Sequence, residues 1–229
     1  MLRQDILRVS LRPGSPLDEL GLSERFGLSR SPIREALVRL SSEGLVQILP
    51  NRSTIVAPLE LQAVPEFLDA LDLYQRVTTR SAARFRMSSD LDRIRALEGA
   101  YNEAAQLSLD TGDTLPMIDT NYDFHMCIAE AGRNRYYTGF YRRVLNDGRR
   151  LLHFYFELQK HDPTINVAKL SMGHREMVEA IERKDEEDAE RIAHEHAIQF
   201  RGRFSDFLSR NVGSAMQLAE LSATSVSDI

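Results

Sequence analysis

The sequence has no tryptophan and only one cysteine, Cys127, among its 229 residues. A single cysteine cannot form an internal disulfide, so a disulfide-stabilised secreted fold is excluded. Long apolar runs are also missing: no uninterrupted run approaches the ~20 residues that a membrane span needs. The first residues lack the apolar segment and small-residue cleavage site of a secretory signal. These absences predict a soluble, cytoplasmic protein with no membrane partner.

Charge is unevenly distributed along the chain. The formal net charge is −5, yet residues 1–58 carry eight arginines and six acidic residues. The remainder therefore carries the whole negative balance. A slightly basic head on an acidic body is typical of a nucleic-acid-binding module attached to a second domain, and 229 residues suffice for two domains.

Residues 1–58 predict three short helices followed by a hairpin. The helices are bounded by good capping and stop residues, namely Asp18, Gly27, Ser29 and Gly44. Two β-rich runs, 45–49 and 53–57, are separated by a Pro-Asn-Arg turn. This order of elements predicts a winged helix-turn-helix domain.

The third of these helices carries the features expected of a DNA-reading helix. Its apolar stripe, Ile33, Leu37 and Leu40, leaves the N-terminal end polar and exposed. Arginine suits that end because its planar fork can donate two hydrogen bonds to guanine, while serine hydroxyls and free N–H groups suit phosphate. The predicted DNA-binding residues are Ser29, Arg30, Ser31, Arg34 and, at the hairpin tip, Arg52. For any one of these arginines, a solvated helix face is the alternative.

Residues 59–65 are predicted to form a linker, and residues 66–210 a helical domain. The pattern there has a 3.6-residue period and indicates six helices, at about 66–86, 89–110, 117–131, 134–159, 164–183 and 186–209. The polar, serine-rich residues 211–229 are expected to be partly disordered, with at most a weak seventh helix near Met216. The predicted fold class is mainly α: a winged head followed by an antiparallel helical bundle.

The head has motifs that resemble a known family. The segments "RPGSPL", "LSERFGLSRSPIREALVRLSSEGLV" and "PNRSTIVAP" together resemble the winged-helix head of the GntR family of bacterial transcription regulators. The resemblance implies a homodimer that binds palindromic operator DNA, with base contacts at Arg30 and Arg34. Leu20, Gly21 and Ser53 depart from the family pattern, which removes one expected DNA contact at Leu20.

Three histidines in the body form a candidate metal site. Asn121 and His125 lie one helical turn apart, and His174 and His196 lie on two later predicted helices. Three imidazoles and an oxygen ligand from different helices suit a divalent metal such as Zn²⁺ or Ni²⁺. On spacing alone, histidines that are separately capped, exposed or hydrogen-bonded remain the alternative.

The body also resembles the FCD ligand-binding domain of the FadR branch of the GntR family. Phe124 and His125 match its Phe-His pair, His174 its helix-opening histidine, and His196 its final histidine eleven residues after an aspartate. Asn121 stands where the family has an acid. The resemblance implies a metal held by the three histidines, with Asn121 as a weaker partner, and a small organic acid as effector. Arg76 and Arg149 are the candidate effector-binding residues.

The leading hypothesis is a metabolite-responsive repressor. One alternative is an architectural DNA-binding dimer whose metal site has decayed, with Asn121 as the trace of that decay. A metal-dependent enzyme is the other alternative, but no His-Glu-x-x-His motif is present. His194 and His196 are about 200° apart around a helix and cannot serve one site. We therefore predict that the chain is not an enzyme.

Overall fold

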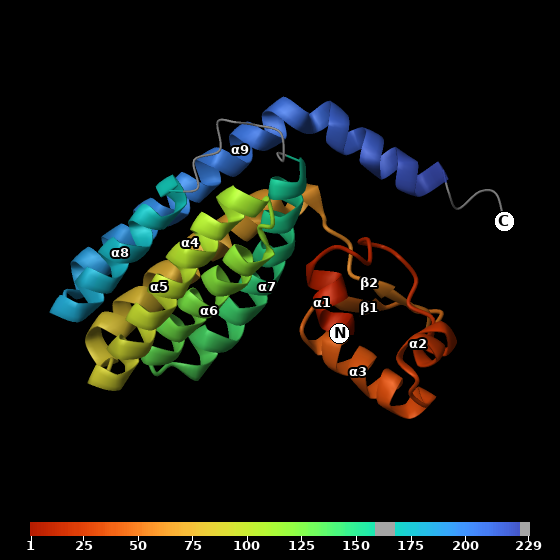
Figure 1. Ribbon diagram of the computed structural model, residues 1–229, viewed down its shortest axis with the longest axis horizontal. Helices are drawn as coiled ribbons and strands as arrows, with labels where there is room; N and C mark the ends of the chain where they lie inside the picture. The colour runs from red at the N-terminus through yellow and green to blue at the C-terminus, as the bar shows by residue number, and fades with distance from the viewer. Residues whose placement is uncertain (159–167, 225–229) are drawn as a thin grey trace.

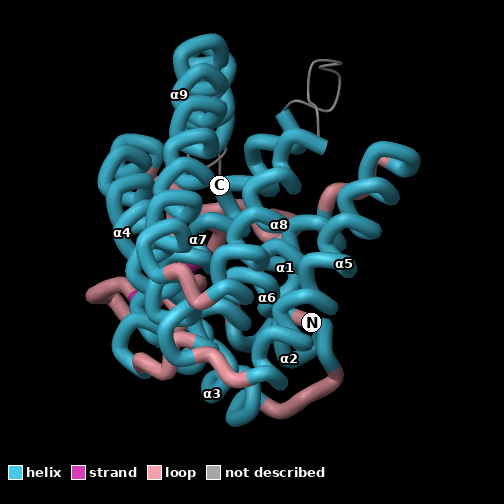
Figure 2. Tube along the Cα trace, turned by 90° about the vertical axis from the view of Figure 1, so that its left-hand side faces the viewer, coloured by secondary structure: helices cyan, strands magenta, loops and turns pink. Residues whose placement is uncertain are grey.

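The structure is a computed structural model that describes residues 1–158 and 168–224 (Figure 1). The side chains of residue 61 and of 157–172 and 207–229 lie outside that description. The fold is mainly α, as predicted, and helices make up most of the described trace (Figure 2). A small N-terminal head stands beside a larger helical bundle (Figure 1).

The head contains three helices and a two-stranded wing. Its elements are α1 (Leu2–Leu7), α2 (Glu19–Phe26), α3 (Arg30–Ser42), β1 (Val46–Ile48) and β2 (Thr54–Val56). The predicted boundaries follow from local chemistry: the Asp18 side chain accepts a hydrogen bond from the Gly21 N–H, and Gly27 ends α2 with φ of 64°. The strands pair antiparallel, with Val46 opposite Val56. Together these elements enclose a small apolar core.

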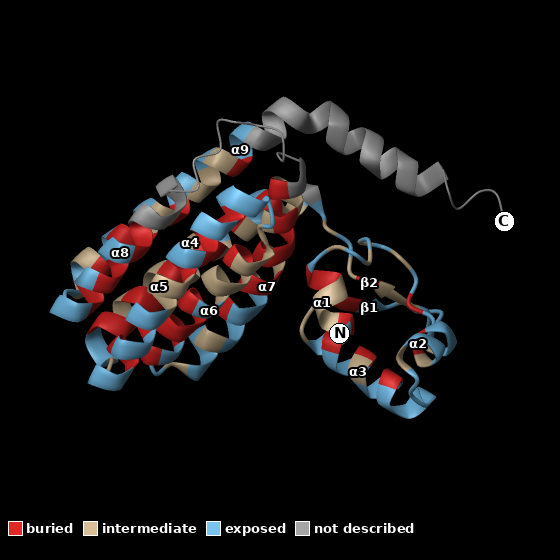
Figure 3. Ribbon diagram, in the orientation of Figure 1, coloured by how far each residue is buried: buried red, intermediate tan, exposed pale blue. Residues whose placement is uncertain are grey.

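The body is built from helices that follow the predicted periodicity closely. They are α4 (Val64–Phe85), α5 (Ser88–Thr111), α6 (Leu115–Ala131), α7 (Arg135–Leu158), α8 (Ala168–Arg183) and α9 (Glu186–Thr224). The buried residues face the inside of this bundle (Figure 3). Helix α4 lies against α6, α7, α8 and α9, so it touches most of the elements that build the interior. Among the described residues, no helix is both long and apolar enough to cross a membrane.

Two boundaries differ from the sequence prediction. Helix α4 begins at Val64 and follows a 3₁₀ turn (η1, Leu61–Ala63), because Pro65 falls in the first turn, where its missing N–H needs no partner. Helix α9 continues to Thr224, well past the expected end near 209. Residues 215–221 are all strong helix formers, which explains the extension. The predicted start of α8 at 164 lies outside the described residues.

Helix α7 is shared between bundle and head. Arg3 of α1 donates to Glu43 within the head and, at 3.4 Å, to the amide oxygen of Asn146 on α7. Arg150 of α7 is only 1% exposed and donates to the main-chain oxygen of Ala57, just beyond β2. Burial lowers the pKa of the Arg150 guanidinium. The two lobes therefore meet through a buried, hydrogen-bonded cation.

Candidate functional sites

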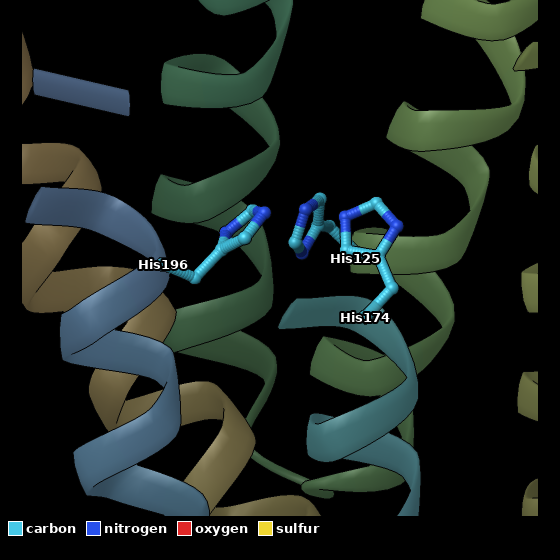
Figure 4. Close-up of side chains that lie close together, drawn as sticks. All are labelled: His125, His174 and His196. Carbon is cyan, nitrogen blue, oxygen red and sulfur yellow. The ribbon is translucent and has the colours of Figure 1, made fainter. Parts of the chain in front are cut away.

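Three histidines from three helices meet inside the bundle (Figure 4). His125 lies on α6, His174 on α8 and His196 on α9. Their ring centroids are 4.9 to 5.5 Å apart, and their facing nitrogen atoms lie within 4.8 Å of one another. The structure thus brings together the three residues that the sequence singled out as metal ligands.

Close approach of α8 to α9 depends on a glycine. A Cβ on Gly173 would stand 2.7 Å from Cδ2 of His196, which is shorter than carbon atoms tolerate. The adjacent His174 is fully buried, and its ring lies 4.4 Å from that of Tyr101 and 4.5 Å from that of Phe124. Gly173 therefore provides the room that lets His196 face His174.

The three imidazoles are held in the neutral form. Burial lowers the pKa of His125 and His174 well below the ordinary value, the nearby His196 lowers both further, and His125 adds to the lowering at His174. Burial and the nearby Arg203 cation lower the pKa of His196 to about 4. Neutral imidazole nitrogens are the donors that Zn²⁺ and Ni²⁺ take from proteins.

The hydrogen bonding around the rings leaves ligand atoms available. Both ring nitrogens of His174 are buried with no hydrogen-bond partner among the described residues. His196 Nδ1 lies 2.7 Å from the Gln75 side-chain amide on α4. If the amide turned its oxygen toward a protonated Nδ1, it would hold His196 with Nε2 free for a metal, the usual arrangement around ligating histidines. The donor set therefore fits a divalent cation.

A cavity of about 70 Å³ adjoins the histidines. His125 and His196 form part of its wall, as does Asn121, one turn before His125 on α6. Most of the remaining wall is apolar and includes Phe67, Leu71, Met117, Leu145 and Phe156. The cavity can accept a small ligand beside the candidate metal.

The two predicted effector-binding arginines lie in different parts of the structure. Arg149 lines the cavity, where its guanidinium lies 4.3 Å from the Tyr122 ring centroid and donates to Asp119. Arg76 is not brought to the cavity, because it donates to Glu190 at 2.7 Å. His194 likewise lies apart and pairs with Asp72.

Arg203 and Gln75 are candidate site residues that the sequence reasoning missed. Arg203 lines the cavity, burial lowers its pKa, and no carboxylate of the described residues lies within ion-pair distance of it. Arg203 follows His196 by seven residues and so lies two helical turns along the same face. This spacing could have identified Arg203 from the sequence. Gln75 offered no comparable signal, because its role depends on the packing of α4 against α9.

The predicted DNA-binding residues gather around the start of α3 and at the wing tip. Ser29, Arg30, Ser31 and Arg34 are exposed, and the Ser29 side chain makes no capping bond, which leaves the first N–H groups of α3 open. Arg34 donates twice to Glu19 of α2, at 3.1 and 2.9 Å. Arg52 occupies the tip of the hairpin with φ of 66°.

Comparison with protein families agrees with both halves of this architecture. A model described as "Bacterial regulatory proteins, gntR family" matches residues 1–56, and one described as "FCD domain" matches residues 66–199, more than half of the chain. The chain belongs to the GntR family. It consists of the head found in gntR-family bacterial regulatory proteins and an FCD domain, and the matched relatives are named as transcriptional regulators.

Individual relatives of this GntR-family chain match parts of its length. The transcriptional repressor RspR of Escherichia coli is 42% identical over 64 residues, which are 28% of each chain. The regulator LutR of Bacillus subtilis is 31% identical over 140 residues, 54% of this chain and 61% of LutR. The chain thus spans between about a quarter and three fifths of the length of these relatives. The solved structure of E. coli McbR/YncC shares the fold, with a TM-score of 0.70 and 22% identity over 90% of this chain and 93% of that one.

Proposed function

We propose that this chain is a metabolite-responsive repressor that binds a palindromic operator as a homodimer. A small carboxylate, bound at a divalent metal in the FCD domain, modulates that binding. His125, His174 and His196 would hold the metal, with Asn121 as a weaker partner. The metal would supply an electrophilic centre for the carboxylate, and Arg149 would border the bound acid.

One observation carries the proposal for the effector site: three neutral histidines, two of them buried and His196 half-buried, converge beside a largely apolar cavity. Burying unpartnered imidazole nitrogens costs about 1–3 kcal/mol for each group, and a metal ion satisfies them. A cation with open coordination positions then attracts an anion from the adjoining cavity.

The metal site is tested by elemental analysis of protein purified without chelator. We expect about one divalent metal per chain, and loss of that metal in His125→Gln. His194→Gln is the matched control, because His194 pairs with Asp72 away from the site. Stoichiometric metal retained in His125→Gln, or absent from the unsubstituted protein, contradicts the proposed site.

An exposed apolar face on α4 and α7 supports the homodimer. Leu73 is 52% exposed, Tyr136 62% and Phe140 58%, and Tyr74 stacks on Phe140 with ring centroids 6.0 Å apart. Two copies of such a face, related by a two-fold axis, bury each other. We expect Leu73→Glu with Phe140→Glu to convert the protein to monomer in analytical ultracentrifugation, whereas Leu109→Glu, exposed on α5, leaves the dimer intact.

Operator binding with and without effector separates a sensor from a scaffold. Two heads must enter major grooves about one helical turn apart, so a ligand that changes their spacing changes affinity. We expect one small acid to weaken binding to an operator selected from random DNA by the purified protein. If no acid alters that affinity, the chain is an architectural DNA-binding dimer.

A further inference from the structure

The positive and negative charges in the described wall of the effector cavity do not balance. Its described wall carries two arginines, Arg149 and Arg203, and no acidic residue. Asp119 already accepts from Arg149, so that charge is compensated. Among the described side chains no acid pairs with Arg203, although burial disfavours its charged form. The part of the cavity wall that the structure describes therefore carries one unbalanced positive charge even before a metal enters.

A divalent ion at the three histidines would deepen this imbalance. Neutral imidazoles contribute no charge, and Asn121 contributes a neutral amide where a carboxylate would have offset one positive charge. The ion would then bring two positive charges next to Arg203 in a largely apolar surrounding. Buried charge is costly unless it is paired, so the metal should bind less tightly alone than with an anion beside it.

We propose that the metal and the effector bind to this chain as a coupled pair, because the effector carboxylate supplies the negative charge that Asn121 does not. One carboxylate oxygen ligates the metal, and Arg203 donates to the carboxylate from α9. This inference rests on the proposed metal site and adds to it a mutual dependence and a residue, Arg203.

The cavity also limits what the acid can be. The largely apolar wall of the cavity matches a monocarboxylate with a short apolar tail. At about 10–15 Å³ for each water-sized position, the cavity volume suits roughly five to seven non-hydrogen atoms. Acids of two to four carbons, such as acetate and butyrate, fall near that limit, and octanoate exceeds it.

Coupling between two sites is reciprocal, which makes the proposal measurable from either side. Whatever factor the acid adds to the metal affinity, the metal adds to the acid affinity. We expect a factor of about 5 to 150, the ordinary range for coupled sites.

The experiment is a calorimetric titration of Zn²⁺ into chelator-stripped, full-length protein. It is run without added acid, with butyrate and with octanoate, at constant ionic strength maintained with perchlorate. We expect butyrate to strengthen zinc binding and octanoate to leave it unchanged. The reverse titration of butyrate is run with and without zinc.

Three variants assign the coupling to the named residues. Asn121→Asp should bind zinc tightly without acid and lose most of the enhancement by butyrate. Arg203→Met should bind zinc more tightly in the absence of acid, because a neighbouring positive charge is removed, and should lose part of the enhancement by butyrate. Arg201→Met is the matched control, because Arg201 lies on the same helix and pairs with Asp69, and it should behave as the unsubstituted protein.

The outcomes separate this inference from the proposed function. Zinc binding that is equally tight with and without butyrate, and unchanged by Asn121→Asp, overturns the coupling but leaves the metal site standing. Butyrate binding that depends on Arg203 and is indifferent to zinc also overturns the coupling. Failure to bind zinc under every condition overturns both the metal site and the inference that rests on it.

Discussion

His125 and His174 are buried and His196 is half-buried, all three as neutral rings, and this links the stability of the metal-free bundle to pH. In the unfolded chain each histidine takes up a proton below about pH 6.5, whereas the folded protein resists protonation until much lower pH, about 4 for His196. Protons therefore favour the unfolded state as the pH falls from 7 to 5. The maximum effect is about 1.4 kcal/mol per pH unit for each histidine.

We expect the melting temperature of chelator-treated protein to fall steadily between pH 7 and pH 5. Asp123 and Asp147 act in the opposite direction, because burial raises their carboxyl pKa. Calorimetry of His174→Phe, which keeps an aromatic ring against Tyr101, should show a shallower dependence. A melting temperature that stays constant across this window contradicts neutral burial of the three rings.

A second residue-scale prediction concerns Gly173. The added methyl group of Gly173→Ala would meet His196 at 2.7 Å, so α8 must shift. We expect a loss of about 1–3 kcal/mol in unfolding free energy together with weaker metal binding. Gly99→Ala, in an open position of α5, should instead stabilise the protein by up to about 1 kcal/mol. If the two substitutions affect metal binding equally, Gly173 has no specific role in the metal site.

The site residues differ in how far sequence could specify them. The histidines could be predicted, because their spacing and resemblance fix both residue type and helix. The arginines could not be ranked in the same way: Arg76 and Arg203 are both on amphipathic helices, and only packing shows that Glu190 holds one while the other lines the cavity. A long charged side chain reaches several places from one backbone position.

At the scale of elements, the start of α3 carries the prediction for operator recognition. Arg34→Ala should cost about 1–3 kcal/mol at the selected operator and relax its sequence preference, because a bidentate base contact is lost. Fluorescence anisotropy with operator and random duplexes measures both effects. Arg39→Ala, near the other end of α3 and beside Glu43, is the matched control. An equal loss on operator and random DNA would reduce Arg34 to a phosphate contact.

The Glu19 carboxylate competes with operator DNA for Arg34. In the protein without DNA, the Arg34 fork is occupied by the Glu19 carboxylate of α2, a contact that the sequence did not predict. Operator DNA must therefore either break the exposed ion pair between Arg34 and Glu19 or bind Arg34 while that pair persists. Helix ends were predictable because caps and glycines act locally, whereas such contacts between helices depend on their packing.

At the scale of the whole molecule, Arg150 joins the two lobes. Arg150→Met keeps much of the side-chain volume but removes the hydrogen bond to Ala57 and the buried charge. We expect effector affinity to persist while the effector's influence on operator binding diminishes, and amide exchange near residue 57 to accelerate. Arg142→Met, exposed on the same helix, is the control. An undiminished effector response in Arg150→Met would show that coupling runs elsewhere.

Sequence could predict two lobes and their order, but not how they touch. The contacts that join them link residues such as Arg3 with Asn146, and Ala57 with Arg150, which are distant in the chain and carry no periodic signal. Arg149 and its neighbour Arg150 lie on the same turn of α7, one in the cavity wall and the other against the head. Only the packing of the bundle determines which of the two arginines faces the cavity and which faces the head.

Because the protein has no tryptophan, the fluorescence of tyrosines near the histidines can be observed directly. With no indole to dominate ultraviolet emission, the fluorescence of the protein comes from its seven tyrosines. Tyr101 lies edge-on to His174 at 4.4 Å, and Tyr141 faces His125 at 6.4 Å. A paramagnetic ion such as Ni²⁺ among the histidines would quench these two emitters most strongly. The native protein therefore carries its own label-free reporter of metal entry.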